Sequence, residues 1–78
     1  MKWMFEVYRL SSDPAGEAFV TALVAQHGGQ LTYVESPEKD NSHNVCLTFE
    51  FSSQVQADAA VQQLRTLGEH VEGPGVYG

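Results

Sequence analysis

The chain has 78 residues, of which ten are acidic and four are basic, so its formal net charge at pH 7 is −6. A chain this short holds one hydrophobic core, so we expect a single domain over residues 1–78. The acidic balance argues against nucleic-acid binding, because that affinity comes largely from Lys and Arg neutralising phosphates. No stretch of about 18 apolar residues predicts a membrane span, and the first residues lack the apolar region of a signal peptide. The sequence therefore predicts a cytoplasmic protein without membrane contact.

Cys46 is the only cysteine, so no disulfide can form within the chain. Inside a predicted strand it is expected to be a small buried hydrophobe in a reducing compartment. A domain of this size buries a modest share of its surface and gains stability from oligomerisation. On these grounds we expect a homodimer.

Residues 2–10 alternate in character and predict a first strand, with Trp3, Phe5 and Val7 on one face. The next four residues, 11–14, end in Asp13-Pro14. A capping residue followed by proline at the first helical position favours a helix start, because proline there loses no needed hydrogen bond.

The first helix is expected to run to Gly28-Gly29, since glycine ends helices readily. One apolar stripe along it is predicted to face the core, and it consists of Ala15, Ala18, Phe19, Ala22 and Leu23. Val20 and Val24 lie outside that stripe. We expect a partner to cover these two valines.

Residues 30–35 alternate again and predict a second strand, which Ser36-Pro37 closes. The polar segment from Glu38 to Asn44 has nothing to bury and is expected to be an exposed loop, whose role the sequence leaves open. Residues 45–51 alternate most clearly of all, so they predict a third strand with one face in the core.

Residues 53–56 have the spacing of a capping box and predict the start of a second helix, which Leu67-Gly68 ends. The tail, residues 70–78, contains glycine and proline. Because both weaken sheet pairing, we expect only a short strand there.

The element order strand-helix-strand-strand-helix-strand predicts an α+β fold, the ferredoxin-like βαββαβ sandwich. In this fold a four-stranded antiparallel sheet, with the first and third strands central, carries both helices on one face. The other face is then half polar, with Met4, Glu6, Tyr8, Cys46, Thr48 and Glu50. Whether this face meets solvent or a partner stays open.

No chemical motif stands out. The spacings of His27, His43, His70 and Cys46 match no known metal-ligand pattern, so we expect neither a metal nor a cofactor. No Ser, Cys or Lys lies in a nucleophile motif, so whether the chain is an enzyme is uncertain, with a non-enzyme favoured.

Two further alternatives concern the sheet face. Glu6 and Glu50 on the central strands would perturb one another's pKa if they were close, but solvated surface glutamates explain them as well. RNA-recognition domains share this strand order and stack bases on aromatic side chains of the sheet. Here Phe49 and Phe51 lie on the core face, and the open face has no basic residue to contact phosphate.

The turn Asp13-Pro14-Ala15-Gly16 and the segment of residues 31–37 resemble an ACT domain. The resemblance is to the regulatory domains of prephenate dehydratases and aromatic amino-acid hydroxylases. It implies a βαββαβ module that binds an amino acid at an interface between paired domains. Glu35-Ser36-Pro37 keeps the family's Glu-Ser-Arg-Pro stretch without its arginine, and Ala15 to Ala18 replaces its Gly-Ala-Leu turn.

A ligand site at the helix start also has a physical basis, because the first N–H groups of a helix are unpaired and attract a carboxylate. Gly16 would let the ligand approach. Asp13 can fill the same donors as an ordinary cap, and Glu35 faces a ligand amino group or is a plain surface residue. The predicted ligand-binding residues are Asp13, Ala15, Gly16, Glu17, Tyr33, Glu35 and Ser36.

Three functional hypotheses follow. The first is a non-enzymatic, ACT-like regulatory module that dimerises and binds a small molecule such as an amino acid. The second is an interaction protein without a ligand that binds another protein through its open sheet face or a helix flank. The third is a small dimeric ferredoxin-like enzyme, with His43 or a sheet-face carboxylate as acid or base.

Overall fold

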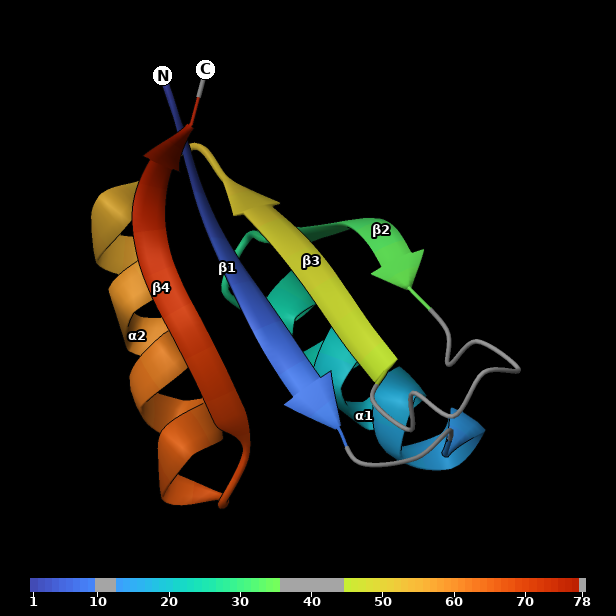
Figure 1. Ribbon diagram of the computed structural model, residues 1–78. Coiled ribbons are helices and arrows are strands. Elements are labelled where there is room, and N and C mark those ends of the chain that lie inside the picture. Colours follow the sequence, from blue (N-terminus) through green and yellow to red (C-terminus); the bar gives the residue numbers. More distant parts are fainter. Residues whose placement is uncertain (10–12, 36–44, 78) are drawn as a thin grey trace.

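The computed structural model describes residues 1–9, 13–35 and 45–77 (Figure 1). Its elements in chain order are β1 (Lys2–Arg9), α1 (Pro14–Gln26), β2 (Gln30–Glu35), β3 (Val45–Phe51), α2 (Gln54–Thr66) and β4 (His70–Tyr77). The four strands form one antiparallel sheet in the order β2-β3-β1-β4, and both helices cover the same face. The predicted ferredoxin-like βαββαβ fold is confirmed, with β1 and β3 in the centre. Ser36 and the expected loop from Glu38 to Asn44 lie outside the described residues.

The core lies between the sheet and the helices. β1 and β3 pair so that Phe5 is opposite Phe49 and Val7 is opposite Leu47, and all four side chains are buried. The Phe5 ring lies 5.6 Å from that of Phe49 and 5.4 Å from that of Phe51. The period-2 alternation that predicted these strands therefore places the large aromatic residues together under the helices.

The second helix begins as the capping pattern predicts. The Ser53 side-chain oxygen accepts a hydrogen bond from the Gln56 backbone N–H at 3.3 Å. The helix ends before Gly68, whose φ of +93° favours glycine. Ala57, Ala60, Val61 and Leu64 face the core.

The predicted core stripe of α1 is confirmed at Leu23 and wrong at its other four residues. Val20, Leu23 and Val24 are the buried residues of this helix, whereas the alanines of the expected stripe are exposed and Phe19 is 58% exposed. Both sides of α1 are apolar, so periodicity alone does not select between them. The valine and leucine side has more surface to bury than an alanine-rich side, which favours it for the core. No partner is needed to cover Val20 and Val24.

The tail forms a longer strand than expected. β4 has eight residues and pairs with β1 over most of its length, from Lys2 opposite Tyr77 to Tyr8 opposite His70. β4 is an edge strand with a partner on one side only, so Pro74, which has no N–H, leaves no second strand without a hydrogen bond. The peptide bond between Gly73 and Pro74 is cis. Across the described residues, no helix has both the length and the apolar character that crossing a membrane requires.

Candidate functional site

At the predicted ligand site, the start of α1, Arg9 contacts two other side chains, those of Asp13 and Glu69. The Arg9 guanidinium donates to both carboxylate oxygens of Glu69, at 2.9 and 2.8 Å, and its Nη2 lies 3.4 Å from Asp13 Oδ2. A Cβ atom at Gly16 would lie 2.5 Å from Asp13 Oδ2 and 2.6 Å from Arg9 Nη2. The side chains of Asp13 and Arg9 therefore lie beside Gly16, and ligand binding there stays a prediction.

The capping expectation for Asp13 is wrong as well. Its side chain makes no capping hydrogen bond to α1, because its carboxylate is turned toward Arg9. The Asp13 backbone N–H instead donates to Glu17 Oε2 at 2.9 Å, from a position one residue beyond that of a capping box. Contacts within the fold thus explain three of the predicted site residues without a ligand: Asp13, Gly16 and Glu17.

The remaining predicted site residues do not join this group. Ala15 is exposed on α1, and Tyr33 and Glu35 are exposed on β2. Among the residues that the structure describes, no hydrogen bond or ion pair links the start of α1 to the end of β2. Whether these two segments form one ligand site with a partner chain stays a prediction.

The open face of the sheet carries a cluster of Glu6, Tyr8 and Cys46, which the sequence placed on this face without predicting their mutual contacts. Tyr8 on β1 lies opposite Cys46 on β3. The Tyr8 hydroxyl donates to Glu6 Oε1 at 3.1 Å, and the Cys46 thiol lies 3.8 Å from Glu6 Oε2. The Tyr8 ring meets His70 of β4 edge-on, with centroids 5.8 Å apart.

This cluster keeps its phenol and its thiol protonated. The pKa of Tyr8 is raised to about 12, mainly by the hydrogen bond to Glu6 and to a lesser extent by burial. Burial and then the negative charge of Glu6 raise the pKa of the Cys46 thiol, whose residue is 7% exposed. Because the thiolate is the reactive form of cysteine, Cys46 is a poor nucleophile at neutral pH.

The Tyr8 hydrogen bond makes a contribution to stability that depends on pH. The phenol has a pKa near 10 in an unfolded chain and about 12 in the folded protein. Its stabilisation is therefore complete below about pH 10 and is lost as the pH rises from about 10 to about 12. We expect urea unfolding to show Tyr8→Phe less stable than the wild type at pH 8, with a smaller gap at pH 11. An equal gap at both values would contradict the shift.

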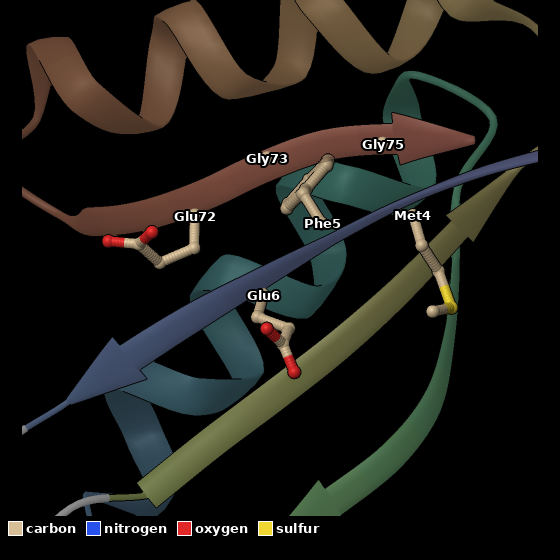
Figure 2. A pocket seen from close by; sticks show the side chains of 6 residues that line it. All are labelled: Met4, Phe5, Glu6, Glu72, Gly73 and Gly75. Carbon is tan, nitrogen blue, oxygen red and sulfur yellow. The ribbon is translucent and has the colours of Figure 1, made fainter. Parts of the chain in front are cut away.

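A shallow hollow of about 300 Å³ lies between β1 and β4 on the same face (Figure 2). It is lined by Met4, Phe5, Glu6, Glu72, Gly73 and Gly75. In Figure 2 the Glu6 carboxylate points from β1 toward β3, and the Glu72 carboxylate points along β4. Met4 lies further along β1, and Phe5 is turned toward the helices.

A β-bulge shapes this hollow. The pairing of β1 with β4 shifts between Met4 and Glu6, so that Phe5 alone faces two residues of β4. Gly73 in the bulge has a φ of +112°, which favours glycine, and a Cβ at this position would lie 3.0 Å from the Met4 carbonyl oxygen. Gly75 lies opposite Met4 and has open space within 4 Å of where its Cβ would be. The missing side chains leave the hollow open.

Two glutamates lie at the hollow at paired positions of β1 and β4. Glu6 and Glu72 are directly opposite on neighbouring strands, an arrangement that is unfavourable without a cation. Glu72 Oε2 lies 2.9 Å from His70 Nε2, and both side chains are more than half exposed. None of the lining residues is basic. The hollow therefore suits a positively charged group.

No family model matches this sequence, and no curated protein is significantly similar to it. The resemblance to ACT domains thus stays a hypothesis. The site must be interpreted from its own chemistry.

The sequence signal that could have indicated the hollow is the pair of glycines in β4. In the sequence, Gly73, Pro74 and Gly75 predict a weak strand. In the fold they form a bulged edge strand that lacks side chains beside two carboxylates. Over the described residues, no group of three or more His, Cys, Asp or Glu side chains is placed to hold a metal ion. His43, the candidate acid or base of the enzyme hypothesis, lies outside the described residues.

Proposed function

We propose that this chain is a non-enzymatic binding module, and that the hollow between β1 and β4 binds the ammonium group of a small molecule such as an amino acid. The observation that carries the proposal is the pair of acidic residues, Glu6 and Glu72, at directly opposite strand positions beside a hollow without a basic lining residue. The proposal keeps the ligand class that the ACT resemblance implies. It places that ligand on the open sheet face instead of at the start of α1.

The carboxylates have hydrogen-bonding capacity left for such a ligand. An ionised carboxylate offers about four acceptor positions. Glu6 accepts from the Tyr8 hydroxyl and lies near the Cys46 thiol, and Glu72 is paired with His70. An ammonium group between the two glutamates would donate to both and would relieve their mutual repulsion, so it is bound by charge-assisted hydrogen bonds.

The local chemistry favours binding over catalysis. Tyr8 and Cys46 hold their protons at neutral pH, because the pKa of each is raised. Glu6 already accepts a hydrogen bond from the Tyr8 hydroxyl. A general base or nucleophile needs a pKa close to the working pH and a free approach to substrate, which neither the phenol nor the thiol of this cluster offers.

Thermal unfolding with matched ligands tests the proposal. The probes are glycine amide, which has an α-ammonium group, Nα-acetyl-lysine amide, which has only a side-chain ammonium group, and Nα-acetyl-glycine amide, which has neither. A ligand at ten times its Kd adds about 1.4 kcal/mol to the free energy of unfolding. For a domain of this size, that raises Tm by roughly 5–10 °C. We expect the first or second probe to raise Tm and the third to have no effect.

Two variants test whether the rise in Tm comes from binding at the hollow. Glu72→Gln removes one carboxylate, and Gly75→Leu fills space that is open in the structure. Both should abolish the ammonium-dependent rise in Tm relative to the same variant without ligand. Asp58→Asn, on the exposed side of α2, removes the same charge elsewhere and should retain the response.

The pattern of responses decides between sources of the ammonium group. A response to glycine amide indicates a free amino acid or other small α-amine. A response to Nα-acetyl-lysine amide alone indicates a lysine side chain, as on a partner protein. If millimolar concentrations of all three probes leave Tm unchanged, or if Glu72→Gln responds like the wild type, the proposal is wrong.

A further inference from the structure

Arg65 extends from helix α2 to the backbone of the edge strand β4, beside which the helix lies (Figure 1). Its Nη2 atom donates to the Val71 carbonyl oxygen at 3.0 Å and to the Gly73 carbonyl oxygen at 3.3 Å. A guanidinium has five N–H donors in a fixed planar fork, so one group can hold two carbonyls at once. Arg65 therefore fixes two points of β4 from the neighbouring helix.

These two points lie on either side of a residue of the proposed ammonium site. Val71 and Gly73 flank Glu72, which lines the hollow, as does Gly73. The pairing of β1 with β4 is regular as far as Glu72 opposite Glu6 and shifts directly beyond that pair. Arg65 thus holds the backbone at the point where the bulge begins.

Little else holds the bulged segment in place. Gly73 and Gly75 have no side chains to pack, and glycine has more backbone freedom than any other residue. A bulge also interrupts the ladder of hydrogen bonds between two strands. Among the residues that the structure describes, Arg65 is the only one whose side chain donates to the backbone of residues 71–75. Its two hydrogen bonds are charge-assisted and therefore strong, so they restrict a segment that has few other constraints.

We propose that Arg65 is a positioning residue of the ammonium site. It does not line the hollow. It acts by holding the two carbonyls, so that Glu72 stays opposite Glu6 and the hollow keeps its shape. The inference rests on the proposed function and assigns to that site a residue of α2. A binding group needs supporting contacts of this kind, because a displacement of about 1 Å weakens its hydrogen bonds.

The positive charge of Arg65 would have the opposite effect on ligand binding. By charge alone, the guanidinium repels an ammonium ligand, so its removal would strengthen binding. By positioning Glu72, the guanidinium favours the ligand, so its removal weakens binding. A general loss of stability leaves Kd unchanged while the protein stays folded. The direction of the change in Kd therefore separates these roles.

Arg65→Met tests the inference, because it removes the guanidinium and retains an unbranched side chain that suits a helix. In NMR spectra of the ligand-free protein, we expect the carbonyl resonances of Val71 and Gly73 and the amide resonance of Gly75 to move, with circular dichroism unchanged. We also expect the Kd of the ammonium probe, glycine amide or Nα-acetyl-lysine amide, to rise about fivefold, the factor of a typical net hydrogen bond. Titration calorimetry well below Tm measures this Kd.

Gln62→Glu is the matched control, because it changes the net charge by the same amount from an exposed position of α2. It should leave the resonances of β4 in place and should not weaken binding. The inference is overturned if Arg65→Met keeps the wild-type carbonyl resonances, or if it binds the probe as tightly as the wild type or more tightly. If the wild type binds neither probe, the ammonium site is wrong and Arg65 has no role in binding, and the carbonyl resonances still show whether it holds the bulge.

Discussion

Phe49→Ala is expected to lower the free energy of unfolding by about 3–5 kcal/mol. Phe49 lies in the central strand β3, is fully buried, and packs with Phe5 in the core beneath the helices. Truncation removes apolar burial and leaves a cavity that rigid neighbours on two strands cannot fill. A chain of this length has a total stability of about 4–12 kcal/mol, so the loss takes much of it.

Chemical denaturation measures this effect, with Phe19→Ala as the control. The control removes the same atoms from an exposed position of α1. Phe19→Ala should cost less than about 0.5 kcal/mol. Equal losses from the two substitutions would show that the core is not where the structure places it.

Gly29→Ala is expected to destabilise the protein by about 1–3 kcal/mol through overpacking. Gly29 follows α1 and leads into β2. A Cβ at this position would overlap the tip of the Phe51 ring and a methyl group of Val24. Both side chains are buried in the core, so neither can move aside without disturbing other contacts.

Gly75→Ala provides the comparison for this prediction. A Cβ at Gly75 meets no atom within 4 Å. This substitution should leave the free energy of unfolding unchanged or raise it by up to about 1 kcal/mol, because alanine restricts the unfolded chain more than glycine does. Both changes can be read from urea midpoints of the purified variants. If Gly29→Ala is as stable as Gly75→Ala, the close approach of Gly29 to Phe51 is wrong.

The sequence predicts the fold well because the strand signal and the capping signals are local. Alternation in β3 and the Ser53 cap of α2 depend on neighbouring residues, and the structure confirms the strand and the cap. Local signals fail for α1, where two sides are apolar and the choice depends on which side has the larger area facing the sheet. They also fail for β4, because its length depends on pairing with β1, far away in the sequence.

The site is harder to predict than the fold, because it depends on tertiary contacts. Asp13 and Gly16 have the sequence pattern of an open helix start. In the structure Arg9 lies beside it and pairs with Glu69, a residue 60 positions away in the sequence. The hollow depends on a bulge that brings Gly75 next to Met4. Knowledge of strand register is needed before either contact can be anticipated.

The sheet register also brings the two ends of the chain together. Lys2 lies opposite Tyr77, and Figure 1 shows both termini at the same end of the sheet. Neighbouring strands are only about 5 Å apart, so a linker of a few residues could join these ends. The fold is thus suited to circular permutation and to insertion into a surface loop of a host protein, where a guest domain must enter and leave at nearly one point.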